Sequence, residues 1–271
     1  VDKRYIYGYK IRKIFKISEY VDKFCFFRKK ISWSKNISLI GPSKWISDCA
    51  KNSILMKDKQ IVTIPNPIDT EKFKPLEKTQ ARKSLKIKIN KKVILFGSID
   101  GGKDPRKGAD LLIDVLRFLK YHKAKIQIVI FGKRSRDQDI FKNTNFEILN
   151  LGKIDSKDKM AAIYSAADIF LIPSRAESFG QTAAEAQSCG TPVVAFDIGG
   201  LKDIIIHNKN GILIEPFNTK KMALAIDNLL GKDKKISKFS KASRESALDN
   251  WNCKKVAKSH IDFYKNILNY E

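Results

Sequence analysis

Cysteine and histidine are scarce in this sequence. Its 271 residues include four cysteines and three histidines. The cysteines are far apart, without a C-x-x-C pair or an adjacent histidine cluster, so we expect no zinc or histidine-based metal site. A lysine-rich chain without a visible secretion signal is typical of the cytoplasm, where thiols stay reduced. The four residues are Cys25, Cys49, Cys189 and Cys253.

Long apolar stretches are also missing. No apolar run approaches the roughly 20 residues needed to cross a bilayer, and the first residues lack the apolar core of a signal peptide. Internal repeats and low-complexity tracts do not occur. The chain begins with Val1 rather than methionine, which we interpret as a processed chain or a fragment. Hydrophobic residues still make up 43% of the sequence, which predicts a folded protein.

Acidic residues and arginine are few relative to lysine. The chain has 53 basic and 29 acidic residues, a formal charge of +24, and only ten of the basic residues are arginines. Because proteins that read bases favour arginine, we expect no nucleic-acid partner. We interpret the lysines as a solvated face that still attracts anions such as phosphates, nucleotides and acidic lipids. A dedicated polyanion site is the less favoured alternative.

Apolar strands alternate with helices from about residue 93 onward. Such continuous apolar strands with intervening helices predict an α/β fold, a Rossmann-type doubly wound parallel sheet. Ligands of these sheets bind at the carboxyl ends of the strands. The predicted strands are 93–97, 126–132, 146–152, 169–173, 192–197 and 211–216, and the predicted helices between them include 108–120, 158–167 and 181–190.

A proline-rich link at 60–75 is the best candidate for a domain boundary. Residues 1–65 supply only about two strands, too few for a complete sheet domain. We therefore predict an incomplete first domain at 1–65, a ligand-binding domain at 66–235 and terminal helices at 236–271. The last of these helices is expected to pack back on the first domain.

Basic and aromatic residues dominate the first 30 positions. Apolar side chains recur there at helical spacing, with lysine and arginine between them. A basic amphipathic helix of this kind can lie on an anionic membrane, although packing on a partner domain is the interpretation that we favour. The recurring residues are Ile11, Ile14, Ile17, Val21 and Phe24.

The segment ESFGQTAAE, residues 177–185, places two carboxylates between a predicted strand and a predicted helix. A carboxylate accepts hydrogen bonds from hydroxyl groups, and the N–H groups at a helix start, here near Gln181, attract phosphate. A sugar nucleotide carries both groups. An acidic first turn that complements the helix dipole is the alternative. This alternative explains the presence of Glu185 but not that of Glu177 or Gly180.

A second anion site is predicted in FGSIDGGKDPRKG, residues 96–108. Its glycines allow a ligand to approach the backbone, and Arg106 and Lys107 bring positive charge to the following helix. Residues 97–103 nearly match a P-loop, but Asp104 replaces the magnesium-binding hydroxyl, so we reject that interpretation. The pair Gly199 and Gly200 forms another turn at a strand end, which by itself indicates little.

Three segments resemble glycosyltransferase family 4, whose members are retaining enzymes of the GT-B fold. Residues 173–216, beginning PSRAESFGQTAAE, look like the donor-site block of that family. Residues 104–116, DPRKGADLLIDVL, are similar to its phosphate-binding strand–helix entry. Residues 42–75 resemble the segment that precedes the second domain. The resemblance covers about residues 38–217 and implies a GT-B-like fold.

This resemblance implies roles for particular residues. Glu177 would meet hydroxyls of the donor sugar, Glu185 would bind the ribose, and Lys107 would neutralise the departing diphosphate. Family members need no metal cofactor, because cations and helix N-termini stabilise the charge on the leaving group. The other residues implied at the site are Ser178, Phe179, Gly180 and Gln181 at the sugar and phosphates, Arg106 beside the diphosphate, and Gly152 to Ile154 at the base.

Two departures from the family pattern affect the prediction. Ser98 stands where the family usually has an arginine, and Arg106 is a candidate substitute. Most of the acceptor-side domain is missing, so we expect the chain to bind a nucleotide sugar without catalysing efficiently alone. The sequence predicts a hexosyltransferase of polysaccharide biosynthesis with a glycan or lipid-linked acceptor, peripheral to the membrane. A related phosphorylase or synthase, and a non-catalytic module or half-enzyme that needs a partner, remain alternatives.

Overall fold

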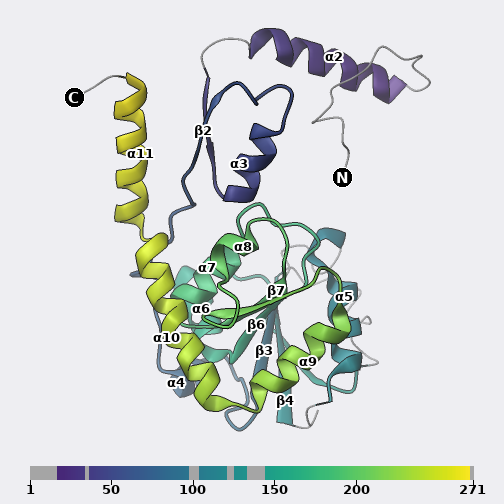
Figure 1. The fold of residues 1–271 in the computed structure, drawn as a ribbon. Coiled ribbons are helices and arrows are strands. Elements are labelled where there is room, and N and C mark those ends of the chain that lie inside the picture. The colour runs from purple at the N-terminus through teal and green to yellow at the C-terminus, as the bar shows by residue number, and fades with distance from the viewer. Residues whose placement is uncertain (1–16, 34–36, 98–103, 121–124, 133–143, 269–271) are drawn as a thin grey trace. The chain divides into compact units, whose positions relative to one another are not determined.

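The computed structural model of the protein describes residues 17–33, 37–97, 104–120, 125–132 and 144–268. The chain divides into two compact units (Figure 1). The larger unit is Asn66–Lys258, and the smaller unit combines Val1–Pro65 with Ser259–Glu271. Helix α11, Cys253–Leu268, passes from one into the other. Each unit is described separately.

A six-stranded parallel sheet forms the centre of the larger unit, with the strand order β5-β4-β3-β6-β7-β8. The chain starts at β3 in the middle, moves outward to β5, and returns to continue from β6 on the other side. The order therefore reverses between β3 and β6, which is where such sheets bind ligands. The strands are β3 Lys92–Gly97, β4 Ile126–Phe131, β5 Glu147–Asn150, β6 Ile169–Ile172, β7 Val193–Phe196 and β8 Gly211–Ile214.

Helices cover both faces of this sheet (Figure 1). Val93 and Leu95 of β3 point toward α4, α6 and α7, whereas the alternating Ile94 and Phe96 point toward α5 and α9. Burial on both faces explains the continuous apolar strands and confirms the predicted doubly wound α/β fold. The helices are α4 Lys78–Ser84, α5 Ala109–Phe118, α6 Lys157–Ala166, α7 Gln181–Ser188, α8 Leu201–Ile204, α9 Thr219–Leu230 and α10 Asp233–Asn250.

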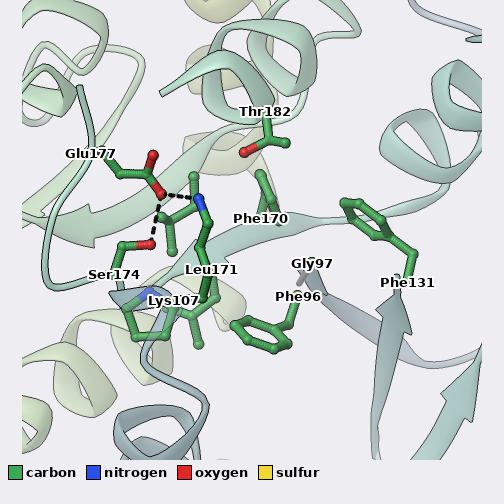
Figure 2. A pocket seen from close by; sticks show the side chains of 11 residues that line it. Phe96, Gly97, Lys107, Phe131, Phe170, Leu171, Ser174, Glu177 and Thr182 are labelled. Atoms are coloured by element: carbon green, nitrogen blue, oxygen red, sulfur yellow. Dashed lines mark hydrogen bonds and ion pairs between the residues drawn. The ribbon is translucent and has the colours of Figure 1, made fainter. Parts of the chain in front are cut away.

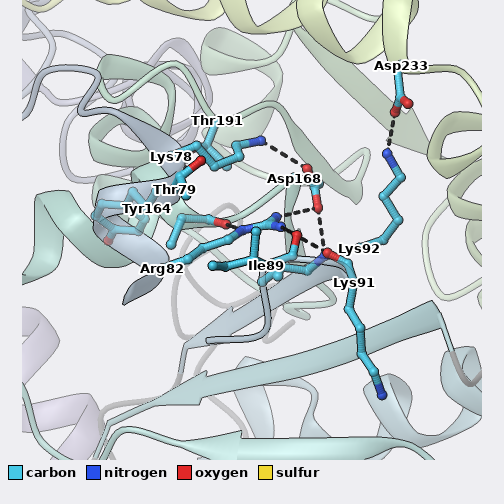
Figure 3. A network of polar contacts seen from close by, with 12 residues as sticks. Lys78, Thr79, Arg82, Ile89, Lys91, Lys92, Tyr164, Asp168, Thr191 and Asp233 are labelled. Atoms are coloured by element: carbon cyan, nitrogen blue, oxygen red, sulfur yellow. Dashed lines mark hydrogen bonds and ion pairs between the residues drawn. The ribbon is translucent and has the colours of Figure 1, made fainter. Parts of the chain in front are cut away.

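A buried ionic network fastens α4 to the sheet (Figure 3). Arg82 donates from Nη2 to Asp168 Oδ2 at 2.8 Å, and its other nitrogens reach backbone carbonyls. Asp168 also accepts from Lys78 Nζ at 2.9 Å and from the Val93 N–H at 2.7 Å. Burial acts to raise the pKa of Asp168, but Lys78 and Arg82 outweigh burial and lower it. The carbonyls belong to Ala166, Ile89 and Lys91.

Helix α10 belongs to the larger unit, which continues to Lys258. The predicted division at 235/236 is therefore not a boundary between compact units. The reason is that Arg244 of α10 donates to the Ser188 carbonyl at the end of α7, at 2.9 Å, and to the carbonyls of Thr70 and Phe73. Asn210, before β8, also donates to Ser246 of α10, at 3.1 Å.

The smaller unit holds a two-stranded parallel sheet, β1 Ser38–Gly41 and β2 Gln60–Thr63. Helix α3, Lys44–Lys51, connects the strands and begins at Ser43, whose hydroxyl accepts from the Ile46 N–H at 3.2 Å. Helix α2 spans Ile17–Ser32. Of the predicted apolar stripe, Val21 and Phe24 are exposed on α2, while Ile11 and Ile14 lie outside the described residues. Within the described chain, every helix is too short or too polar to span a membrane.

Candidate functional site

The carboxyl ends of β3, β4 and β6 and the segments that follow β3 and β6 meet at a pocket where the strand order reverses (Figure 2). Gly97 ends β3 and Phe131 ends β4, and both line the pocket. Its polar lining comes from Lys107, Ser174, Glu177 and Thr182. This is the expected ligand position in a doubly wound sheet.

An ion pair between Lys107 and Glu177 crosses this pocket (Figure 2). Lys107 Nζ lies 2.7 Å from Glu177 Oε1, and the Ser174 hydroxyl donates to the same oxygen at 2.8 Å. Only 12% of the Glu177 side chain and 30% of the Lys107 side chain are exposed. Partial burial strengthens such a pair relative to one in water. The predicted acid and cation, 70 positions apart, are thus neighbours.

The turn that carries Lys107 ends next to the segment after β6. Residues Pro105–Lys107 form a 3-10 turn, η1, which the Asp104 carboxylate caps by accepting from the Arg106 N–H at 2.9 Å. Gly108 ends the turn with a φ of 68°, and a Cβ there would stand 2.0 Å from the Pro173 carbonyl oxygen. Glycine is therefore required for this approach.

Arg106, which the family resemblance places beside the diphosphate, pairs with a residue of its own turn. Its guanidinium pairs with Asp104, at 2.9 Å between Nη2 and Oδ2, and 75% of the side chain is exposed. It is not among the described residues that line the pocket. Ser98, where the family has an arginine, and the predicted glycine–lysine run 101–103 lie outside the described residues.

The backbone of the 177–179 segment rests on the two glycines after β7. The Gly200 N–H donates to the Glu177 carbonyl at 2.9 Å. A Cβ at Gly199 would stand 2.2 Å from the Glu177 oxygen, and one at Gly200 would stand 2.3 Å from the Ser178 oxygen. The glycine pair thus supports the site, because larger residues would displace the backbone that carries Glu177. Phe179 is buried in the core and anchors the same segment.

Helix α7 starts at the pocket. Gly180 precedes it with a φ of 96°, a left-handed conformation that suits glycine. Thr182, in the first turn, lines the pocket. The N-terminal end of a helix carries partial positive charge and favours anions. Lys107 and this helix end therefore place two sources of positive potential at one pocket.

Glu185 lies one turn further along α7, beside the pocket rather than in its described lining. Its carboxylate accepts from the Tyr164 hydroxyl at 3.0 Å and from Gln181 Nε2 at 3.3 Å. Burial raises the pKa of Glu185. The Tyr164 ring packs edge-on against Phe131, with 6.0 Å between centroids, and Phe131 lines the pocket. Glu185 is thus connected to the pocket through two aromatic rings.

Gly152 and Ile154 follow β5. Gly152 has a φ of 69° and open space around its Cα, and its carbonyl accepts from the Gly132 N–H after β4 at 2.8 Å. Ile154 packs partly against the core. Both residues lie at the carboxyl ends of the strands, although neither is among the described residues that line the pocket.

Sequence reasoning missed Ser174, Thr182 and Tyr164. Ser174 and Thr182 flank Glu177 and Gln181 in the printed sequence, so the strand-to-helix junction was the available signal. Tyr164 was predicted only as part of a helix. Within the described residues, no group of three or more histidine, cysteine or carboxylate side chains is arranged to hold a metal ion.

A doubly wound sheet with a cation, an acid and a helix start at its strand-order reversal is typical of nucleotide-binding domains. Residues 77–246 match the family described as glycosyl transferases group 1. The match covers more than half of the 271 residues. This chain therefore belongs to that family, and the predicted glycosyltransferase is confirmed at this level.

Several of the similar proteins are named as glycosyltransferases. D-inositol 3-phosphate glycosyltransferase of Mycobacteroides abscessus is 33% identical over 206 residues, 72% of this chain and 44% of that protein. Sucrose-phosphate synthase of Thermosynechococcus elongatus superposes with a TM-score of 0.79 at 24% identity, over 95% of this chain and 65% of the other. Anabaena HepE, solved with UDP and glucose, superposes with a TM-score of 0.70 at 20% identity, over 84% and 62%.

These superpositions establish that the fold is GT-B-like. The chain spans about half the length of the curated relatives it matches, from 42% to 51% for three of them.

Proposed function

We propose that this chain is the donor-binding half of a retaining, family-4 glycosyltransferase. The whole enzyme would move a hexosyl group from a nucleoside-diphosphate sugar to a glycan or lipid-linked acceptor in polysaccharide biosynthesis. The observation that carries the proposal is the Lys107–Glu177 pair, 2.7 Å apart, at the reversal point of the sheet. One cation and one acid in a single pocket match the two ends of the donor, a diphosphate and a polyhydroxylated sugar.

The chemistry divides between these two side chains. Lys107 neutralises charge on the diphosphate as the bond to the sugar breaks, assisted by the N–H groups at the start of α7. Glu177 accepts hydrogen bonds from sugar hydroxyls. Because a lysine ammonium carries three donors, Lys107 holds Glu177 and can donate to a phosphate oxygen of the donor as well. These groups stabilise the leaving diphosphate without a metal ion.

The nucleoside would lie toward β4 and β5. Glu185 takes the ribose hydroxyls, and the backbone at Gly152 to Ile154 borders the base. The open space around Gly152 and its place at the strand ends support this assignment. The UDP in the Anabaena HepE structure supports a nucleoside diphosphate as the ligand class.

The smaller unit is proposed to be the final part of an acceptor-side domain. It has a two-stranded sheet, and the curated relatives are about twice as long as the matched region. A half-enzyme that needs a partner, or a non-catalytic nucleotide-binding module, is the second candidate, favoured by the same two observations.

Exposed Phe24 and Ile31 on the basic helix α2 support contact with the cytoplasmic face of a membrane.

Calorimetric titration with UDP, GDP and ADP, each with and without an attached hexose, tests the proposal. We expect binding of at least one diphosphate, and Lys107→Met should weaken it. Lys221→Met is the matched control, because Lys221 also pairs with a glutamate, Glu215, but on the surface. If no compound binds to the unaltered chain, the donor-domain proposal is wrong.

A further inference from the structure

Arg175, two residues before Glu177, joins its segment to the turn that carries Lys107. Its backbone N–H donates to the Arg106 carbonyl at 2.6 Å, and its Nη1 donates to the Pro105 carbonyl at 2.7 Å. The guanidinium also binds both carboxylate oxygens of Asp110, at 2.9 and 2.5 Å. Arg175 therefore holds the chain on both sides of Lys107.

The contacts of Arg175 with Pro105 and Asp110 suit the side chain of an arginine better than that of a lysine. A guanidinium presents its donors in a rigid fork that can bind a carboxylate with two parallel hydrogen bonds, whereas a lysine ammonium acts as a point charge. The fork of Arg175 binds a carboxylate in the first turn of α5 and a carbonyl of η1 together. Gly108 lets the two segments touch at the same place. The side chain of Arg175 and the backbone at Gly108 thus join the same two segments.

Stability alone does not explain these contacts. The Arg175 side chain is 36% exposed and that of Asp110 is 63% exposed. Solvent screens an ion pair that is exposed to this degree, so its contribution to folding is small. The position of Lys107, however, determines whether it can meet both Glu177 and a phosphate. A displacement of about 1 Å at such a site can cost two orders of magnitude in rate.

We propose that Arg175 is a positioning residue that sets the separation of Lys107 and Glu177 for a diphosphate-bearing ligand. This inference rests on the proposed function and adds that binding of the diphosphate requires Arg175 to hold Lys107 in place. Arg175 acts through Lys107 and does not itself contact the ligand. Asp110 is its anchor on α5.

Affinity measurements test the role. The full chain and its Arg175→Ala variant would be titrated with UDP, GDP, ADP and the three corresponding nucleosides. We expect Arg175→Ala to bind the preferred diphosphate about tenfold more weakly and the nucleoside unchanged, with partial recovery in Arg175→Lys. Arg117→Ala is the matched control, because Arg117 forms an exposed pair with Asp114 on the same helix α5.

A double variant shows whether Arg175 acts through Lys107. In the Lys107→Ala background, Arg175→Ala should cause no further loss of diphosphate affinity. Additive losses, or equal losses for diphosphate and nucleoside, would overturn the positioning role. Absence of any binding by the unaltered chain would instead refute the proposed function.

Amide hydrogen exchange tests the junction without a ligand. Arg175→Ala should speed exchange in both segments, 104–111 and 173–180, relative to Arg117→Ala. Unchanged exchange in the two segments would overturn the inference, whatever the outcome of the titrations.

Discussion

At the scale of single residues, the site contains two carboxylates that are held by specific neighbouring side chains. Glu177 is paired with Lys107 and held by the Ser174 hydroxyl. Glu185 accepts a hydrogen bond from the Tyr164 hydroxyl, and burial raises the pKa of its carboxyl. The two carboxylates of one sequence segment therefore differ in environment, and each allows a different test.

Glu177→Gln separates binding of the sugar from binding of the nucleotide. Glutamine keeps the size of the side chain but loses the negative charge that accepts hydrogen bonds from sugar hydroxyls. We expect affinity for the nucleotide sugar to fall by about tenfold, and affinity for the nucleotide alone to fall less. Calorimetry with the paired ligands measures both. Equal losses would contradict the role assigned to Glu177.

Glu185 makes stability depend on pH. Burial raises its pKa above the ordinary value of 4.5, so the folded protein binds this proton more tightly than the unfolded chain. Its stabilising contribution is complete below 4.5 and is lost as the pH rises through the folded-state pKa. We expect the free energy of unfolding of the unaltered chain to fall relative to Glu185→Gln over that range. Urea unfolding measures the difference, and a constant difference would refute the prediction.

At the scale of elements, the larger unit is joined by polar contacts between segments far apart in the chain. Arg82 ties α4 to the end of α6 and to the start of β3. Arg175 ties the β6–α7 segment to α5. Gly199 and Gly200 support the backbone of Glu177. The orientation of the pocket therefore depends on how helices and strand ends are fixed to one another.

Arg82→Leu should strongly destabilise the larger unit. The substitution removes the buried one of the two cations that pair with Asp168, and leaves that buried carboxylate with only Lys78 as a cationic partner. Breaking a buried ion pair in this way costs about 3–5 kcal/mol. Urea unfolding measures the loss, and adding Asp168→Asn should recover part of it because the uncompensated charge is then removed. A loss below that of the exposed Arg117→Leu would contradict this interpretation.

At the scale of the whole molecule, a complete six-stranded sheet accompanies a two-stranded one. The larger unit buries apolar side chains on both faces of its sheet. The smaller unit leaves large apolar residues such as Tyr20 and Phe24 exposed. Under the proposed function, the larger unit is the donor-binding part and the smaller unit belongs to the acceptor side.

We therefore expect the 271-residue chain to bind its donor without transferring the sugar. Release of the nucleoside diphosphate in the presence of candidate glycan or lipid-linked acceptors measures transfer. Lys107→Met, which should bind the donor more weakly and transfer no sugar, sets the background. Turnover by the unaltered chain well above that background would contradict the half-enzyme interpretation and favour a complete enzyme.

The sequence by itself determined the alternation of strands and helices, because side-chain periodicity and glycine at strand ends act over a few residues. It also marked Lys107 and Glu177 as candidates. The tertiary structure alone decided that these two meet and that Arg175 reaches Asp110. Such pairings join segments up to 70 positions apart, so they depend on strand order and helix placement, which no local pattern encodes.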